Sequence, residues 1–224
     1  MEKRIQIEFK NKDLLKEALT HRSYLNENPK WGVPHNERME FLGDAVLELI
    51  VTENLFSSYP SYSEGELTSI RAALVNYQTL AKVARNIDLD ASIYLSKGEA
   101  KDTDRAKEVI LANAIEALIG AIYLDNGYDS VSNFIKEYVL SLLPEIVEKK
   151  LYKDPKSYLQ EIIQEKLKLT PTYEVLSEEG PDHNKIFEVG AYFGEKLAGT
   201  GRGHSKQDAE IEAAKDALEK ISKN

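Results

Sequence analysis

Hydrophobic and polar positions in the first two thirds of the chain follow the three-to-four-residue period of helices. This pattern predicts helices over 11–19, 36–56, 65–76, 77–86, 110–124 and 129–143. From residue 154 the pattern changes, with a helix to about 167, strand patterns at 172–177, 186–193 and 196–200, and a helix starting near 205. The sequence therefore predicts a mainly α chain, with an all-helical domain over 1–148 and an α-β-β-β-α domain over 154–224.

Local signals sharpen several of the expected helix ends. Asn11 is a plausible N-cap, and Ser63 with Glu66 three residues later resembles a capping box. Asp154 followed by Pro155 reads as an N-cap with proline at the first helical position. We expect a turn at Gly127 and a linker over 148–154.

A stripe of carboxylates runs along the expected helix 36–56. Its members are spaced by three, four and four residues, which places them on one helical face: Glu37, Glu40, Asp44 and Glu48. We expect the intervening apolar residues to pack this helix into the domain interior, and they are Met39, Phe41, Leu42, Ala45, Val46, Leu47, Leu49 and Ile50. The stripe is either a solvated face or one side of a site for a hard divalent cation, which would relieve the repulsion between like charges.

The stretch 110–124 is apolar nearly all round, so its helix should be buried. Its polar exceptions, Asn113 and Glu116, lie three residues apart on one face, and a buried carboxylate needs a partner. One solution is a site shared with the acidic stripe, an all-oxygen donor set suited to magnesium. The alternative is a structural hydrogen bond between Asn113 and Glu116. Neither helix carries a Glu-x-x-His pair, which argues against a di-iron bundle.

Composition narrows the function classes. The 224 residues are 42% hydrophobic and 30% charged, typical of a globular protein, and contain no cysteine, which excludes disulfides and thiolate metal sites. No apolar run is long enough to span a membrane and no signal-type segment opens the chain, so we expect a cytoplasmic protein. The net charge of −9 means that any polyanion must bind local patches. One candidate patch is the glycine-rich segment 199–206, just before the last helix. The alternative is that this segment is an ordinary turn.

Over nearly its whole length the chain resembles the bacterial ribonuclease III family. The signature stretch is His-Asn-Glu-Arg-Met-Glu-Phe-Leu-Gly-Asp-Ala at 35–45. Supporting motifs lie at 19–24, 63–67, 71–75 and 116–125. The part from 154 to 222 is similar to a double-stranded-RNA-binding domain.

This resemblance implies an all-helical nuclease domain that forms a homodimer and hydrolyses double-stranded RNA. It implies cleavage by metal-activated water, leaving 5′-phosphates, 3′-hydroxyls and short 3′ overhangs, in the processing of ribosomal and messenger RNA precursors. The resemblance implies magnesium, with manganese as a substitute, held by Glu40, Asp44, Asn113 and Glu116. It also implies that Glu37 and Glu64 assist at the cleavage site, although Glu64 equally suits the dipole of a helix N-terminus.

For the second domain the resemblance implies RNA contacts that read the shape of the duplex. The implied contact residues are Gln160, Glu161, Gln164, the 181–183 loop with His183, Ser205 and Lys206.

Two positions depart from the family pattern. Asn113 replaces the usual aspartate, and an amide can coordinate magnesium but adds no negative charge. The alternative function is therefore a catalytically impaired protein that binds duplex RNA without cutting it. The second departure is the sequence Ser-Lys-Gln-Asp at 205–208, which is less basic than usual and predicts modest, weakly salt-dependent RNA binding.

Overall fold

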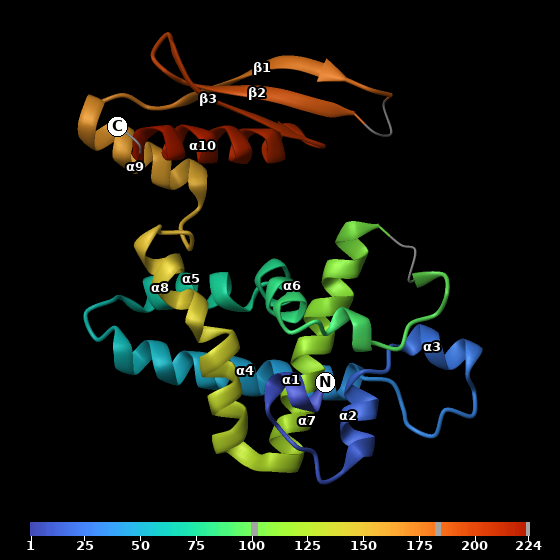
Figure 1. The fold of residues 1–224 in the computed structure, drawn as a ribbon. Coiled ribbons are helices and arrows are strands. Elements are labelled where there is room, and N and C mark those ends of the chain that lie inside the picture. The colour runs from blue at the N-terminus through green and yellow to red at the C-terminus, as the bar shows by residue number, and fades with distance from the viewer. Residues whose placement is uncertain (100–102, 182–184, 223–224) are drawn as a thin grey trace. The chain divides into compact units, whose positions relative to one another are not determined.

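A computed structural model describes residues 1–99, 103–181 and 185–222 and divides the chain into two compact units (Figure 1). The first unit is Met1–Tyr152, and the second unit is Lys153–Asn224. The first is built from helices, and the second combines two helices with a three-stranded sheet. The predicted fold class is confirmed. Within the described ranges no helix has the length and apolarity needed to cross a membrane.

The helices of the first unit pack around α4 and α7. In chain order they are α1 (Glu2–Ile5), α2 (Lys12–Ala18), α3 (Arg22–Glu27), α4 (Glu37–Ser58), α5 (Glu64–Val75), α6 (Tyr77–Asn86), η1 (Asp90–Ser92), α7 (Asp104–Tyr138), η3 (Leu140–Leu142) and α8 (Leu143–Glu148). The core includes Leu47 and Val51 from α4 and Leu118, Ile119 and Ile122 from α7, all fully buried.

The predicted helix ends are observed where side chains cap them. The Asn11 side chain accepts a hydrogen bond from the Asp13 backbone, and Ser63 and Glu66 form the reciprocal capping box of α5. Asp154 caps the helix that begins at Pro155, with Asp154 Oδ1 2.9 Å from the Ser157 nitrogen.

Helix α7 joins the two helices expected over 110–124 and 129–143. The expected turn at Gly127 is a kink within it, because Gly127 has φ 82° and ψ −176°, outside helical geometry. A positive φ is favourable for glycine and costly for most other residues. After α7 the chain continues into η3 and α8, so the pattern after 138 did not predict the correct helix ends.

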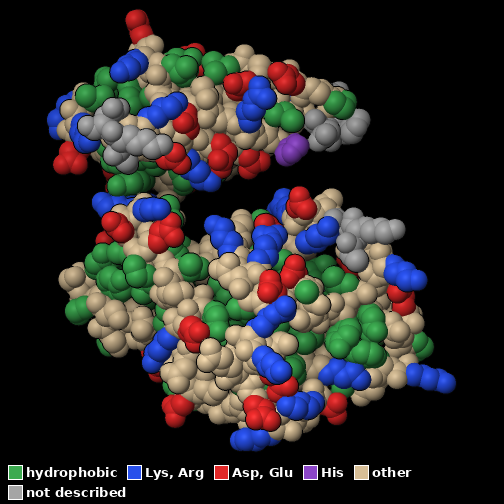
Figure 2. Space-filling model, in the orientation of Figure 1, with side chains coloured by type: hydrophobic (Ala, Val, Ile, Leu, Met, Phe, Trp, Pro, Cys, Tyr) green, Lys and Arg blue, Asp and Glu red, His purple; other side chains and the backbone are tan. Residues whose placement is uncertain are grey.

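One expectation for α4 is wrong. Phe41 is 81% exposed and Leu49 is 52% exposed, although both were expected in the interior. Phe56, at the end of the same helix, is 75% exposed. Met39, Val46, Leu47 and Ile50 are buried as expected, so only one side of α4 packs within the chain. Figure 2 shows that hydrophobic side chains do reach the surface of the first unit among charged ones.

The second unit places α9 (Pro155–Leu167) and α10 (Lys206–Ser222) on one face of a sheet (Figure 1). The sheet is antiparallel in the order β1 (Thr172–Glu179), β2 (Ile186–Phe193) and β3 (Lys196–Gly203). A register shift between Val175 and Ser177 interrupts the pairing of β1 with β2. The small core of the second unit lies between the two helices and the sheet. Its buried members are Leu159, Ile163, Val189, Ala191, Ala209, Ala213, Ala214 and Ala217.

The glycine-rich stretch before α10 is strand rather than an anion-binding loop. Gly199, Gly201 and Gly203 lie in β3, where a Cβ on Gly201 would stand 2.2 Å from the Ala213 nitrogen. These glycines therefore let α10 lie directly on the sheet. Close packing explains the glycine pattern, for which the sequence left open an anion-binding patch or an ordinary turn.

Candidate active site

The candidate active site lies where α4 and α7 cross with their backbones in contact. A Cβ on Gly43 of α4 would stand 1.7 Å from the carbonyl oxygen of Glu116 on α7. A Cβ on Gly120 of α7 would stand 2.5 Å from the carbonyl oxygen of Met39 on α4. Each helix therefore carries glycine at the point of closest approach, which lets neighbouring side chains of the two helices meet.

This crossing brings together the residues predicted as metal ligands. The Asn113 side chain of α7 lies beside the Glu40 carboxylate of α4, where its amide lowers the pKa of that carboxyl. Asp44 and Glu40 both act electrostatically on Glu116. Asn113 thus faces a carboxylate of the other helix, whereas the alternative placed its partner at Glu116 on its own helix.

Burial and mutual repulsion shift the pKa values of two of these carboxyls. Burial raises the pKa of Glu116 to about 8, and the charges of Asp44, Glu40 and Glu48 add to the shift. Burial also raises the pKa of Glu40, with contributions from Glu37 and Asp44, while the hydrogen bond from Asn113 opposes the rise. The crossing is therefore a partly desolvated cluster of acids, and a divalent cation would relieve its repulsion.

The chemistry of the donor set fits a hard cation. Three carboxylates and one amide supply only oxygen ligands, which suit magnesium rather than zinc. Across residues 1–99, 103–181 and 185–222, no three His, Asp or Glu side chains already converge as a preformed metal site. The carboxylates would therefore have to rotate toward a bound ion.

The structure places the other two predicted catalytic residues differently. Glu37 lies in the first turn of α4, where its carboxylate is 3.0 Å from Arg22 Nη1 and repels Glu40. Glu64 is the first residue of α5, and its carboxylate accepts a hydrogen bond from Thr68 Oγ1 at 3.2 Å. Glu37 is thus tied to the acidic cluster, whereas Glu64 is not among the charges that act on Glu40 or Glu116.

Glu48 is a member of the cluster that the predicted set omitted. Its charge is among those that raise the pKa of Glu116. Its place four residues after Asp44 in the acidic stripe was the available signal. Arg22, paired with Glu37, had no comparable signal because the two residues are far apart in sequence.

Most of the predicted RNA-binding residues of the second unit are exposed on its helices. Gln160, Glu161 and Gln164 follow one another along the exposed side of α9, and Glu161 pairs with Lys153 at 2.5 Å. Ser205 accepts a hydrogen bond from the Asp208 backbone and so caps the start of α10. Lys206 Nζ is 3.5 Å from Glu178 Oε1. His183 lies outside the described residues.

Comparisons with known proteins identify both units. The profile described as ribonuclease-III-like matches residues 11–143, and the double-stranded RNA binding motif matches residues 155–221. Ribonuclease 3 of Carboxydothermus hydrogenoformans is 47% identical over 220 residues, covering 98% of this chain and 93% of the relative. Ribonuclease 3 of Sulfurovum sp. is 46% identical over 223 residues, covering 100% and 97%.

A solved structure agrees with these matches. The nuclease domain of ribonuclease III from Campylobacter jejuni has 40% sequence identity and a TM-score of 0.58, and it covers 64% of this chain and 96% of that one. That structure is described as flexible in a region involved in dimer formation. The matches extend over both units and nearly the full length of the relatives. The chain therefore belongs to the ribonuclease III family of double-strand-specific endoribonucleases.

Proposed function

We propose that this protein is a magnesium-dependent endoribonuclease that cuts both strands of duplex RNA. The products would carry 5′-phosphates and 3′-hydroxyls with short 3′ overhangs, and the substrates would be ribosomal and messenger RNA precursors in the cytoplasm. The observation that carries this proposal is the acidic cluster at the α4–α7 crossing, in which Asn113 lies beside Glu40 and burial together with three neighbouring acids raises the pKa of Glu116.

Glu40, Asp44, Asn113 and Glu116 would hold the metal, with manganese able to substitute. Bound magnesium would lower the pKa of a water molecule and offset negative charge on the phosphate. The protein itself fixes the donors through the close helix crossing at Gly43 and Gly120. Glu37, at the edge of the cluster, would orient water or RNA, and we propose that Glu64 assists from α5.

The first test incubates the purified full chain with a long perfect RNA duplex, in magnesium or in EDTA, and resolves the products on a gel. Short products that require magnesium support the proposal. Glu116→Gln should abolish cleavage while leaving the RNA gel shift intact. Glu145→Gln is the matched control, because Glu145 is an exposed acid on α8 that forms an ion pair with Lys149 four residues away. Turnover retained in Glu116→Gln would remove Glu116 from the metal site.

Asn113 supports a second candidate, a duplex-binding protein that does not cut. The amide brings no charge to the metal, so cleavage could depend on the missing carboxylate. Asn113→Asp separates the two functions. A large gain in cleavage would favour the second candidate, whereas an unchanged rate would show that the amide already serves as a ligand.

We also propose that two chains associate through the first unit. Phe41, Leu49 and Phe56 are 81%, 52% and 75% exposed along α4, and several large apolar side chains exposed on one helix support an association site there. A homodimer would supply two cleavage sites, one for each strand. Light scattering after size exclusion should show a dimer that Phe41→Asp converts to a monomer. Leu167→Asp, a matched exposed position on α9, should leave the dimer intact.

We propose that the second unit binds the duplex through Gln160, Glu161, Gln164, His183, Ser205 and Lys206. The exposed side of α9 and the start of α10 supply the described members of this set, and His183 belongs to it by its place in the sequence alone. Recognition through such contacts would depend on the shape of A-form RNA more than on its sequence.

A further inference from the structure

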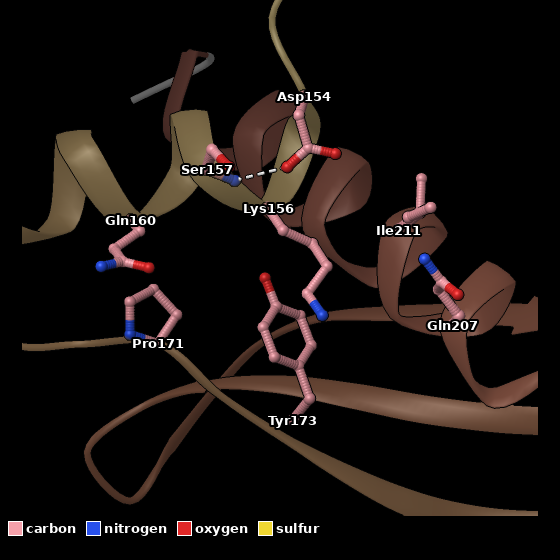
Figure 3. A pocket seen from close by; sticks show the side chains of 8 residues that line it. All are labelled: Asp154, Lys156, Ser157, Gln160, Pro171, Tyr173, Gln207 and Ile211. Atoms are coloured by element: carbon pink, nitrogen blue, oxygen red, sulfur yellow. Dashed lines mark hydrogen bonds between the residues drawn. The ribbon is translucent and has the colours of Figure 1, made fainter.

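A pocket of about 340 Å³ opens in the second unit between α9, the start of α10 and the start of β1. Figure 3 shows Lys156 and Gln160 reaching into it from α9, Tyr173 rising from β1, and Gln207 with Ile211 facing it from α10. This volume falls within the range of about 300–1,000 Å³ that is usual for small-molecule sites. The acidic cluster of the first unit has no part in this pocket.

The hydroxyl of Tyr173 is the unexplained group of the pocket. It is shielded from solvent and has no hydrogen-bond partner among the described residues. Buried hydroxyls are almost always hydrogen-bonded, so an orphaned one indicates a missing partner. Burial raises the pKa of Tyr173 to about 12, with contributions from Glu210 and Asp154, so the hydroxyl stays protonated and needs an acceptor.

The charges around this hydroxyl argue against a phosphate as that acceptor. Lys156 Nζ lies 4.8 Å from the centre of the Tyr173 ring, but it is already paired with Glu210 at 2.5 Å. Asp154 also lines the pocket, and its carboxylate acts on Tyr173. Two carboxylates against one paired ammonium disfavour an anion, so the occupant should be neutral.

The remaining lining suits a planar polar ring. Gln160 and Gln207 each present an amide donor beside an amide acceptor, the combination that base edges also carry. Pro171 and Ile211 supply apolar surface. Lys156, Gln160 and Gln207 are long and flexible, so they can turn aside to expose the Tyr173 hydroxyl to a ring acceptor.

We propose that this pocket binds an unpaired nucleobase of the RNA substrate, with the Tyr173 hydroxyl donating a hydrogen bond to a ring nitrogen or carbonyl oxygen. The inference rests on the proposed function, because Gln160 is both a pocket residue and one of the proposed duplex contacts. A base extruded from a duplex held against α9 would lie next to the pocket. The second unit would then prefer duplexes that carry a bulged nucleotide over perfect ones.

The test measures binding of the full chain, in EDTA to prevent cleavage, to three matched RNA duplexes. One is perfect, one carries a single-nucleotide bulge, and one carries an abasic bulge that bends the duplex equally but lacks the base. We expect the base-containing bulge to bind about 10-fold more tightly than the abasic one, the scale of one base held by stacking or apolar contact.

Tyr173→Phe removes only the orphaned hydroxyl and should reduce this preference by about 3-fold or more, the effect of one hydrogen bond. Tyr192→Phe is the matched control, because Tyr192 lies on β2 opposite Thr172 and Leu197 and outside the pocket. The preference of each variant is the ratio of its affinities for the two bulged duplexes. A variant that binds all RNA more weakly keeps this ratio, so it is not mistaken for one that has lost base recognition.

Equal affinities for the two bulges would overturn the inference and would indicate recognition of the bend or of a backbone phosphate. If Tyr173→Phe left the ratio of the two bulge affinities unchanged, this would also overturn the inference. The absence of binding to all three duplexes would overturn it too. Cleavage of the perfect duplex in magnesium reports separately on the proposed function. Loss of base preference with cleavage retained would reject the pocket alone.

Discussion

The substitution Gly43→Ala tests whether the α4–α7 crossing builds the active site. The added Cβ would stand 1.7 Å from the Glu116 carbonyl oxygen, whereas ordinary van der Waals contacts begin at 3.4 Å. The atoms that it meets are backbone, so no side-chain rotation can relieve the clash. The helices must separate by more than an ångström, which moves Glu40 and Asp44 away from Asn113 and Glu116.

Overpacking of this kind costs about 3 kcal/mol at its upper end, which corresponds to a melting temperature roughly 6–12 °C lower for a protein of this size. A displacement of about 1 Å can cost roughly 100-fold in rate. Calorimetry and single-turnover cleavage in magnesium measure the two effects. Gly65→Ala is the control, because nothing lies within 4 Å of the added Cβ in α5. A normal melting temperature and a normal rate in Gly43→Ala would refute the reasoning.

Three further predictions concern other parts of the molecule. Gly201→Ala should unfold the second unit, since its Cβ would stand 2.2 Å from the Ala213 nitrogen, and limited proteolysis should then degrade the second unit before the first. Because the folded pKa of Glu116 is raised to about 8 from 4.5, the stability that it contributes below pH 4.5 is lost as pH rises through about 8. Melting in EDTA should therefore show a drop over that window that Glu116→Gln reduces, and an equal drop in both proteins would contradict the assignment. Glu178→Gln should release Lys206 for phosphate, tighten RNA binding at low salt and steepen the logarithmic salt dependence by about 1, and an unchanged slope would rule out this competition.

Much of the fold was predictable because short-range chemistry determines it. The caps at Asn11, Ser63 and Asp154 join residues two or three positions apart, so their geometry depends little on the rest of the chain. The kink at Gly127 was visible as a turn signal for the same reason. The glycines of β3 were misread because their role depends on α10, a partner across the fold that a local pattern does not reveal.

The candidate site was predictable in part. Spacing placed Glu40 and Asp44 on one face of a helix. A polar pair inside the apolar helix 110–124 needed a partner because burying an unpaired carboxylate is costly, and this cost predicted that the two helices meet. Spacing did not show that Asn113 acts on Glu40 across the crossing, or that Glu48 acts on Glu116. Those relations depend on the angle and depth of the helix crossing, which Gly43 and Gly120 set.

The charges of the second unit explain how this chain combines RNA binding with a net negative charge. Figure 2 shows acidic and basic side chains interleaved over this unit, and Lys156, Lys206 and Arg202 each pair with a carboxylate of the same unit. Each such pair must open before its cation can neutralise a phosphate, so we expect the salt-dependent share of the affinity to be small. Under the proposed binding mode, affinity would come more from contacts that need no net charge, such as the carboxamides of α9 and the orphaned hydroxyl of Tyr173. An RNA-binding unit that depends little on charge gains most of its affinity from contacts with particular features of the RNA. An unpaired base beside the duplex is such a feature.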